Sequence, residues 1–485
     1  MDKSNKIREG FWLILMVTVM LFGLNLIPDN TTIFGLLLKP VDIISDLKES
    51  DEYNYDDYQF QDNSESSNKK ENKLINENKT LSNSLNYASI LPLDLSIFGV
   101  DGTTEETSKD EVNNITRNVK IIGNLDQMKY FFNALGQTKN DKIRVAHYGD
   151  SGIEGDLITA QLREKLQNQF GGKGVGFLAI TSQDVKFRTT TEMTFSDTWE
   201  TASVFTSNPK KLPLGINGEV FIPKGSGWVE YSTTPRRFKN IKTFNTVRLF
   251  YSDADNSQIT ASFDGGEKTS YKLVSSTSVK ELTIDPKKSV KNVRLEFPGV
   301  KKGYFYGCSL EEGNGIYVDN FPLRGNSGAS IKDLPQTNLK DFNKLLNYKL
   351  IILQFGLNVA NQRQKDFSWY EKEMAAVISH LKTAFPNTSI LLISVSDKSV
   401  KKGGKFVTDP GVISLLKAQQ NIAQDNGIAF WNLFEAMGGP NSMPQWVDSN
   451  PPKAFKDYTH FNLDGAADIA ELLGDALLDA YKNKK

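Results

Sequence analysis

The segment IRVAHYGDS, residues 143–151, joins a strand-like apolar run to a sharp break in the chain. Its first six residues have the composition of a buried strand, and Gly149-Asp150-Ser151 ends that strand. Apolar residues then recur at helical spacing, at Leu157, Ile158, Leu162, Leu166 and Phe170. We therefore predict that Ser151 lies at a strand-to-helix turn, where backbone N–H groups and the helix dipole favour developing negative charge. Such a turn suits a nucleophile, although Gly-Asp-Ser also forms ordinary turns and helix N-caps.

Three strand-like runs follow later in the chain, at residues 350–355 (LIILQF), 389–395 (SILLISV) and 428–431 (IAFW). They alternate with amphipathic helical stretches, which is the pattern of a parallel sheet covered by helices on both faces. The sequence therefore predicts an α/β domain with three layers.

Polar side chains lie where such a sheet would bind a ligand. Gly356-Leu357-Asn358 follows the run that ends at residue 355, so the Asn358 amide is placed to stabilise an oxyanion. Near the C-terminus, Asp457-Tyr458-Thr459-His460 precedes a predicted helix. The three-residue spacing lets the Asp457 carboxylate fix the tautomer of His460, whose other nitrogen can take a proton from a serine.

The sequence has three histidines. His147 falls inside the first predicted strand, and His380 lies beside the apolar stripe of a predicted helix, so we interpret both as structural. For His460 the alternative is a loop histidine that bonds only to a backbone carbonyl.

These segments together resemble the blocks of the SGNH (GDSL-type) hydrolases. Gly149-Asp150-Ser151 is similar to the first block, Gly356-Leu357-Asn358 to the third, and Asp457 with His460 to the last. The second block, a glycine that supplies a backbone N–H, resembles Gly328 in RGNSGA (residues 324–329), with Gly325 as the alternative. Val359 stands where the family has an aspartate, which affects the hydrogen bonds of that loop more than the chemistry. The resemblance covers residues 142–163 and 320–485.

The resemblance implies a catalytic set and an oxyanion hole. The catalytic residues would be Ser151, His460 and Asp457. The oxyanion hole would consist of the backbone N–H groups of Ser151 and Gly328 and the side chain of Asn358. No cofactor and no metal are expected.

About 170 residues separate Ser151 from Gly328, far more than in a minimal enzyme of this family. Residues 186–312 contain alternating runs such as TVRLFY (246–251) and NVRLEF (292–297), separated by turn residues, which predicts an inserted β-sandwich. An insertion here resembles the peptidoglycan O-acetylesterase branch of the family, in which a carbohydrate-binding-like β module interrupts the hydrolase domain.

Several residues of this region have two readings. Trp199, Trp228 and Tyr231 could stack on sugar rings, but core packing is the simpler interpretation of each. Asp253-x-Asp255-Asn256 carries oxygen ligands suited to calcium, yet a polar turn is favoured because no EF-hand pattern is present. Residues 171–176 (GGKGVG) lack the ending of a phosphate loop and are interpreted as the turn after the first helix.

Composition excludes other classes of protein. Lys plus Arg total 57 against 58 for Asp plus Glu, so net charge gives no reason to expect nucleic-acid binding. A single cysteine, Cys308, excludes an intrachain disulfide and any site that needs several cysteines.

Residues 11–28 (FWLILMVTVMLFGLNLIP) form an apolar run preceded by three basic residues, which predicts an uncleaved, single-pass helix in the cytoplasmic membrane, with a cleaved signal peptide as the alternative. We expect an anchor at residues 1–48 and a largely disordered polar tether at 49–118, interrupted by an apolar island at 90–100. The hydrolase domain would occupy residues 119–185 and 313–485 and face outward, to the periplasmic or extracellular side.

The expected function is a serine esterase that removes O-acetyl groups from cell-envelope polysaccharide or peptidoglycan. Two alternatives remain open: an O-acetyltransferase that uses the same serine on a glycan hydroxyl, and a non-catalytic glycan-binding scaffold. The expected partners are an O-acylated glycan, the membrane and envelope polysaccharide-modifying proteins.

Overall fold

The computed structural model describes residues 116–483, apart from residues 205, 207, 235, 236 and 301, together with two short paired strands near the N-terminus. Those strands are β1 (Thr32–Ile33) and β2 (Leu36–Leu37). They belong to a different unit of the chain from the fold described below.

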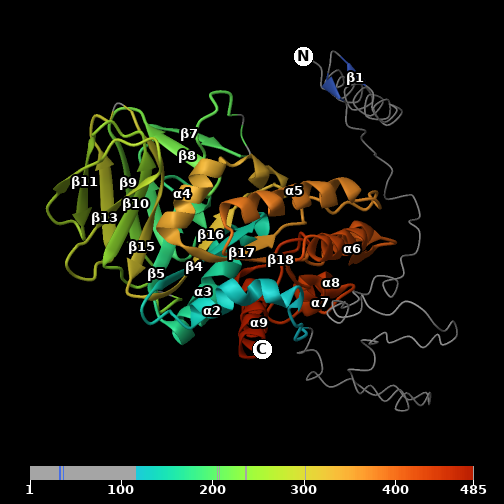
Figure 1. Ribbon diagram of the computed structural model, residues 1–485. Helices are drawn as coiled ribbons and strands as arrows, with labels where there is room; N and C mark the ends of the chain where they lie inside the picture. The colour runs from blue at the N-terminus through green and yellow to red at the C-terminus, as the bar shows by residue number, and fades with distance from the viewer. Residues whose placement is uncertain are drawn as a thin grey trace, which may run out of the picture. The chain divides into compact units, whose positions relative to one another are not determined.

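A six-stranded sheet forms the centre of this unit (Figure 1). Its order is β16 (Gly315–Pro322), β4 (Lys142–Gly149), β17 (Tyr348–Gln354), β18 (Ser389–Ile393), β21 (Ala429–Trp431) and β3 (Ile122–Gly123). Neighbours are parallel except for the antiparallel edge strand β3. Numbered by their order along the chain, the five parallel strands lie across the sheet in the order second, first, third, fourth and fifth. The order therefore reverses between β4 and β17, and open α/β sheets bind their ligands at such a switch point.

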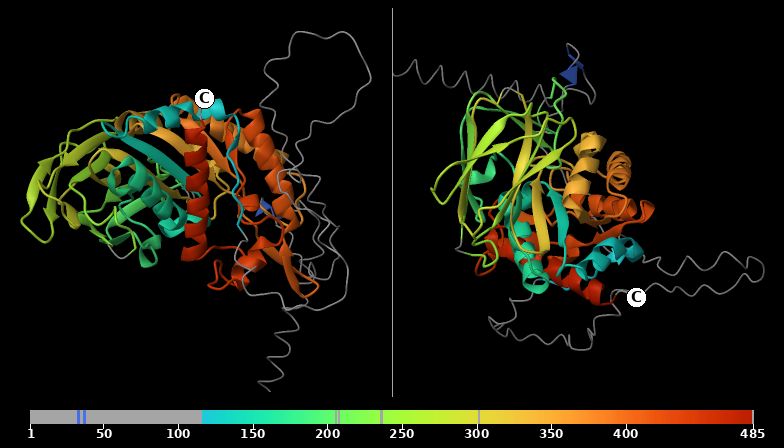
Figure 2. Two further views of the ribbon diagram at one scale, coloured as in Figure 1. Left: turned by 90° about the horizontal axis from the view of Figure 1, so that it is seen from below. Right: turned by 60° about the vertical axis from the view of Figure 1, so that its left-hand side comes forward.

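Helices cover both faces of this sheet, and successive strand residues point to opposite faces. In β17, Ile351 and Leu353 pack with the helices α4 (Gln336–Leu346), α5 (Ser368–Ala384) and α6 (Pro410–Asp425). Leu350 and Ile352 pack on the other side, with α2 (Lys129–Leu135), α3 (Leu157–Phe170), α7 (Leu433–Ala436), α8 (Ser442–Asp448) and α9 (Leu463–Lys482). Figure 2 shows α9, in red, along this second face. The predicted three-layer α/β architecture is confirmed.

Strand β16 was not predicted from the sequence. It carries Asp319 and Asn320 in its middle and ends in a proline, so it lacks the apolar run of its neighbours. Both polar side chains are nevertheless buried, because each has hydrogen-bond partners inside the protein.

The part of the chain that follows α3 and precedes β16 forms a β-sandwich of two antiparallel sheets (green to yellow in Figure 1). One consists of β13 (Lys280–Ile284), β10 (Thr246–Ser252), β15 (Tyr304–Glu312), β8 (Glu219–Pro223) and β7 (Trp199–Ser203), with β5 (Lys173–Leu178) also paired to β15. The other consists of β12 (Thr269–Lys272), β11 (Gln258–Phe263), β14 (Asn292–Phe297), β9 (Gly227–Thr233) and β6 (Thr191–Phe195). A buried apolar cluster fills the space between them, with Leu249 from the first sheet and Leu295 from the second.

Strand β5 lies before residue 186, where the sequence placed the start of the insertion, yet it pairs with a sandwich strand. Only Gly171 and Gly172 form the turn that was predicted for residues 171–176. The glycines of this strand make the segment look like a turn in the sequence. At Gly174 the glycine has a steric reason, because a Cβ there would lie 2.3 Å from the carbonyl oxygen of Leu310. The close pairing of β5 with β15 therefore requires a glycine there.

A buried ionic network joins the sandwich to the central sheet. Arg144 on β4 donates to both carboxylate oxygens of Asp319 on β16, at 2.7 and 2.5 Å, and to Ser309 Oγ on β15, at 2.6 Å. It also pairs with Glu311 on β15, and none of the three charged side chains is exposed to solvent. Two carboxylates facing one guanidinium in the interior fix the inserted domain against the central sheet.

The predicted membrane helix at residues 11–28, the tether and the apolar island at residues 90–100 lie outside the described residues. Within residues 116–483, no helix combines the length and the hydropathy that crossing a membrane would require.

Candidate active site

Ser151 is the first residue of a short 3₁₀ helix, η8 (Ser151–Asp156), directly after β4. Asp150 is its N-cap, and the carboxylate accepts a hydrogen bond from the N–H of Gly152 at 2.9 Å. The N–H of Ser151 has no hydrogen-bond partner within the described part of the chain. The chain thus presents a serine hydroxyl and an available backbone donor together at the carboxyl edge of the sheet.

The three side chains predicted to be catalytic lie in series. Ser151 Oγ is 2.9 Å from His460 Nε2, and His460 Nδ1 is 2.8 Å from Asp457 Oδ2. Asp457 Oδ1 also accepts from the backbone N–H groups of Thr459 and His460, each at 3.0 Å. The His460 side chain is 38% exposed and that of Asp457 48%, so a substrate can reach the imidazole.

Hydrogen bonding keeps Asp457 ionised. Partial burial raises the pKa of its carboxyl, but the N–H and ring of His460 and the N–H of Thr459 outweigh burial and hold the pKa below its ordinary value. An ionised Asp457 fixes a proton on His460 Nδ1 and leaves Nε2 to accept a proton from Ser151.

Asp150 connects the nucleophile to the loop after β17. Its Oδ2 accepts from the N–H groups of Gly356 and Leu357 at 3.3 and 3.2 Å. Val359, which replaces the family's aspartate, is 6% exposed and packs into the core, and its N–H donates to the Gly356 carbonyl at 2.9 Å. Asp150 and the backbone therefore hold this loop without a carboxylate at position 359.

The structure brings Asn358 and Gly328 close to Asn326. The N–H of Gly328 donates to Asn326 Oδ1 at 2.7 Å, and Asn358 Nδ2 donates to the Asn326 carbonyl at 3.3 Å. Gly328 can therefore stabilise an oxyanion only if its present bond is released or shared, whereas Asn358 has a second amide hydrogen. The alternative, Gly325, is exposed, and its N–H has no partner among the described residues.

The other two histidines are structural, as predicted. His147 is fully buried, with Nε2 3.0 Å from Gln354 Oε1 and Nδ1 3.0 Å from Thr159 Oγ1. Burial lowers its pKa to about 4, because a charged imidazole would lose its hydration. His380 on α5 bonds through Nε2 to the Leu334 carbonyl at 2.9 Å.

The aromatic candidates of the sandwich are mostly used for packing. Tyr231 is fully buried, and its hydroxyl donates to the Ala179 carbonyl at 2.7 Å. Trp199 packs edge-on against Phe297, and the face of Trp228 is covered by the Arg294 guanidinium 3.8 Å away. Packing therefore accounts for Tyr231 fully and for one contact of each tryptophan ring.

The segment at residues 253–256 is a tight turn. Asp253, Asp255 and Asn256 all have left-handed backbone, with φ between 43° and 52°. Side chains that can bind a metal do not gather in threes anywhere in the described chain.

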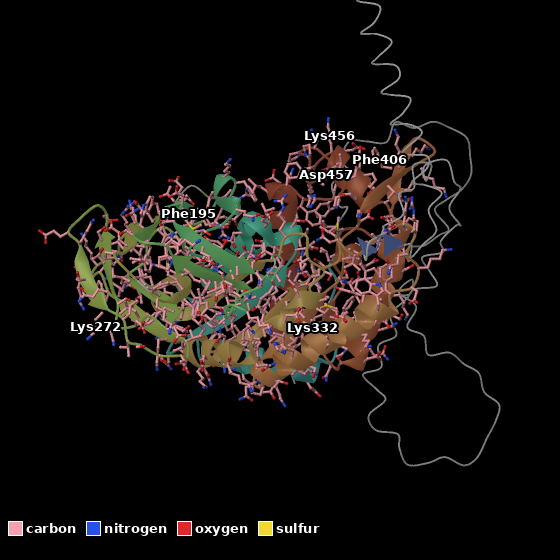
Figure 3. All side chains as sticks on the ribbon, turned by 90° about the horizontal axis from the view of Figure 1, so that it is seen from above. Phe195, Lys272, Lys332, Phe406, Lys456 and Asp457 are labelled. Atoms are coloured by element: carbon pink, nitrogen blue, oxygen red, sulfur yellow. The ribbon has the colours of Figure 1, made fainter. Side chains whose placement is uncertain are left out.

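Sequence reasoning missed the contacts that hold the Asp457–His460 loop. Tyr458 has φ of 53° and stacks on Phe406 of the hairpin β19 (Ser399–Lys402) and β20 (Lys405–Thr408), with ring centroids 3.6 Å apart and planes inclined by 11°. The Tyr458 carbonyl accepts from the N–H of Ser399 at 3.0 Å. Figure 3 shows Phe406 beside Lys456 and Asp457. Two short alternating runs around Gly403-Gly404 are the sequence signal that could have revealed this hairpin.

Comparisons with known proteins rest on structure. No family model and no curated protein matches the sequence. A solved peptidoglycan O-acetylesterase superposes with a TM-score of 0.61 and 19% identity, covering 75% of this chain and 98% of its own. Two further structures are more remote. A family 3 carbohydrate esterase from Talaromyces cellulolyticus has a TM-score of 0.26 and 15% identity, covering 34% of this chain and 73% of its own. A salicylyl-acyltransferase from a tetracycline biosynthetic pathway has a TM-score of 0.28 and 13% identity, covering 62% of this chain and 97% of its own. The described chain therefore shares its fold with the peptidoglycan O-acetylesterase.

Proposed function

We propose that the protein is a serine esterase that removes O-acetyl groups from a cell-envelope glycan through an acyl-serine intermediate. The observation that carries this proposal is the serine–histidine–aspartate series, with separations of 2.9 and 2.8 Å. The fold shared with a peptidoglycan O-acetylesterase supports the choice of a glycan ester as substrate.

The reaction would proceed in two acyl transfers. Ser151 Oγ attacks the acetyl carbonyl while its proton passes to His460 Nε2, and the resulting imidazolium is stabilised by Asp457. Collapse of the tetrahedral intermediate breaks the ester bond, and the sugar oxygen leaves with the proton from His460. Water then attacks the acyl-serine, His460 takes and returns its proton, and acetate is released.

The Ser151 N–H is the backbone donor best placed to hold the oxyanion, because it has no other partner among the described residues. Gly328 and Asn358 are the further donors in this proposal. Loss of one donor of this kind typically lowers turnover by about 10²- to 10³-fold.

The test compares acetate release from O-acetylated peptidoglycan by wild type, Ser151→Ala and Ser379→Ala. Ser379 is an exposed serine on α5 and serves as the matched control. We expect loss of activity only in Ser151→Ala, by about 10⁴-fold or more. Equal acetate release by Ser151→Ala and wild type would reject the mechanism, whereas no release above background by either protein would leave a glycan-binding scaffold. A soluble oligosaccharide acceptor added to the same assay separates hydrolysis from transfer, because more acetyl-sugar than free acetate would identify an acetyltransferase.

We also propose that the apolar run at residues 11–28 anchors the enzyme in the cytoplasmic membrane, with its site on the outer side. The basis is the sequence alone. The variant Ser182→Cys, labelled with a thiol reagent on intact cells, tests this orientation. We expect labelling of intact cells, whereas labelling only after the cells are broken would place the site inside.

A further inference from the structure

An ion pair links two chain segments that the proposed reaction needs together. Glu154 lies in η8, three residues after Ser151, and Arg324 is the first residue of segment 324–328, which ends at the glycine proposed as an oxyanion donor. Arg324 Nη1 lies 2.7 Å from Glu154 Oε2. Within the described chain, no other hydrogen bond or ion pair joins this segment to η8. The pair is therefore the direct polar link between the segment and the nucleophile's turn.

The backbone of η8 changes direction at Glu154. Its ψ of 150° is extended rather than helical, and Gly155 follows with a left-handed φ of 69°. A glycine is required at this second position, because a Cβ there would lie 2.7 Å from the ring of Phe187. The Gly155 N–H donates to Asp184 Oδ2 at 3.1 Å. A defined kink therefore carries the Glu154 side chain, rather than a regular helix surface.

The fold gains little stability from this pair. Glu154 is 7% exposed, whereas the Arg324 side chain is 62% exposed. Burial raises the pKa of the Glu154 carboxyl above its ordinary value, although the Arg324 charge acts in the opposite sense. An ion pair with so exposed a partner adds little to the free energy of unfolding. Stability alone therefore does not explain a carboxylate at this place.

The hydrogen bonds of Asn326 hold segment 324–328 without reaching η8. Its side chain accepts from the Gly328 N–H at 2.7 Å, and its carbonyl accepts from Asn358 Nδ2 at 3.3 Å. The segment is thus bonded to itself and to the loop after β17. If Arg324 were released, the segment would keep these bonds but lose its polar link to the turn that carries the nucleophile.

We propose that Glu154 and Arg324 are positioning residues for the acyl transfer. The pair holds segment 324–328, with the backbone N–H groups of Gly325 and Gly328, at a fixed place beside Ser151. Both residues act through these backbone donors rather than on the ester itself. The inference rests on the proposed esterase function and deepens it, because it names the contact that aligns one side of the oxyanion hole.

The test measures kcat and KM for 4-nitrophenyl acetate in wild type, Glu154→Gln, Arg324→Met and the double variant. We expect each single variant to lower kcat by about ten-fold with KM within about two-fold of wild type, because the donors hold the transition state more tightly than the bound ester. The double variant should be no slower than the slower single variant, since both substitutions break one contact. Arg324→Lys keeps the charge and should recover part of kcat.

Lys268→Met is the matched control. It removes an ion pair of the sandwich in which the basic side chain is 59% exposed, and it should keep wild-type kcat. The urea midpoint of Arg324→Met should equal that of Lys268→Met, so that a lower kcat does not reflect unfolding. A further readout is the Ki of benzeneboronic acid, whose tetrahedral adduct with Ser151 occupies the oxyanion hole. This Ki should rise by the factor by which kcat falls.

A kcat in Glu154→Gln and Arg324→Met equal to that of Lys268→Met would overturn the proposal. Losses that multiply to about a hundred-fold in the double variant would also reject it, because the two residues would then act separately. A boronate Ki that stays constant while kcat falls would place the effect outside the oxyanion hole. These failures leave the proposed function standing when wild type cleaves the ester. If wild type cleaves no ester, the proposed function itself fails and the inference falls with it.

Discussion

Asp150 is the residue whose substitution tests the geometry of the site most directly. Its carboxylate accepts three backbone N–H bonds, one from Gly152 next to the nucleophile and two from Gly356 and Leu357 in the loop that carries Asn358. In Asp150→Asn one acceptor oxygen becomes an amide donor. The amide must then face either the single N–H or the pair, so at least one buried N–H loses its partner.

The cost follows from these contacts. An orphaned buried donor costs about 1–3 kcal/mol, and the oxyanion loop can shift away from Ser151 because one tie between them is broken. A displacement of about 1 Å at a catalytic group can lower the rate by about 10²-fold. We expect Asp150→Asn to reduce kcat on 4-nitrophenyl acetate by about ten- to hundred-fold at pH 7.5. Asp285→Asn, at an exposed turn where the carboxylate accepts from the Lys287 N–H, is the control and should keep wild-type kcat.

The same substitution changes how stability depends on pH. Burial raises the pKa of Asp150 from its ordinary 3.8 to about 6, although the N–H groups of Gly152, Leu357 and Gly356 act in the opposite sense. The native chain therefore binds this proton more tightly than the unfolded chain does. Stability from this proton is fully present below about pH 4 and is lost as pH rises through 6, by up to about 3 kcal/mol.

Denaturant unfolding at pH 4, 5, 6 and 7 measures this effect. We expect the stability difference between wild type and Asp150→Asn to shrink as pH rises across that range, because the asparagine does not titrate. A difference that stays constant with pH, or a kcat equal to that of Asp285→Asn, would refute the account of Asp150 as an ionisable tie between the two loops.

Two further substitutions probe the rest of the fold. Arg144→Met should lower the free energy of unfolding by about 3–5 kcal/mol in urea titrations, because Asp319 would keep a buried charge without its partner. The control is Lys268→Met, which removes an exposed ion pair and should lower the free energy of unfolding by under about 1 kcal/mol. Phe406→Ala should lower kcat several-fold with little change in KM for a small ester, because it removes the ring stacked on Tyr458, and Phe406→Tyr should restore it. A kcat in Phe406→Ala equal to wild type would mean that the hairpin has no positioning role.

The sequence predicted those parts of the fold that local patterns encode. Strands β4, β17, β18 and β21 have near-continuous apolar runs because both faces of a parallel sheet are buried. Strand β16 lacks such an apolar run because it carries Asp319, whose burial is stabilised by Arg144, a partner 175 residues earlier in the chain. Such long-range pairing leaves no periodic signal, so only the folded chain reveals it.

The candidate site divides in the same way. Ser151, Asp457 and His460 could be named from motif and spacing, because the Asp–His contact spans three residues and the serine follows a recognisable strand. The oxyanion donors could not be settled, because whether an N–H is available depends on its other partners. Gly328 illustrates this: its N–H is already bonded to a side chain two residues away.

Two separate sets of contacts hold the catalytic groups in place. The nucleophile and the Asn358 loop are tied by Asp150 across the point where the strand order reverses. The loop that carries His460 belongs to neither strand. It is held by the ring and carbonyl of Tyr458 and by the His460 carbonyl, which accepts from the Phe455 N–H at 2.9 Å. The hydrogen bond between Ser151 and His460 is therefore the junction of two independently supported elements. A site built in this way can lose alignment from either side, because the hydrogen bonds of the Asp150 carboxylate and the contacts of Tyr458 with Phe406 and Ser399 have no residue in common.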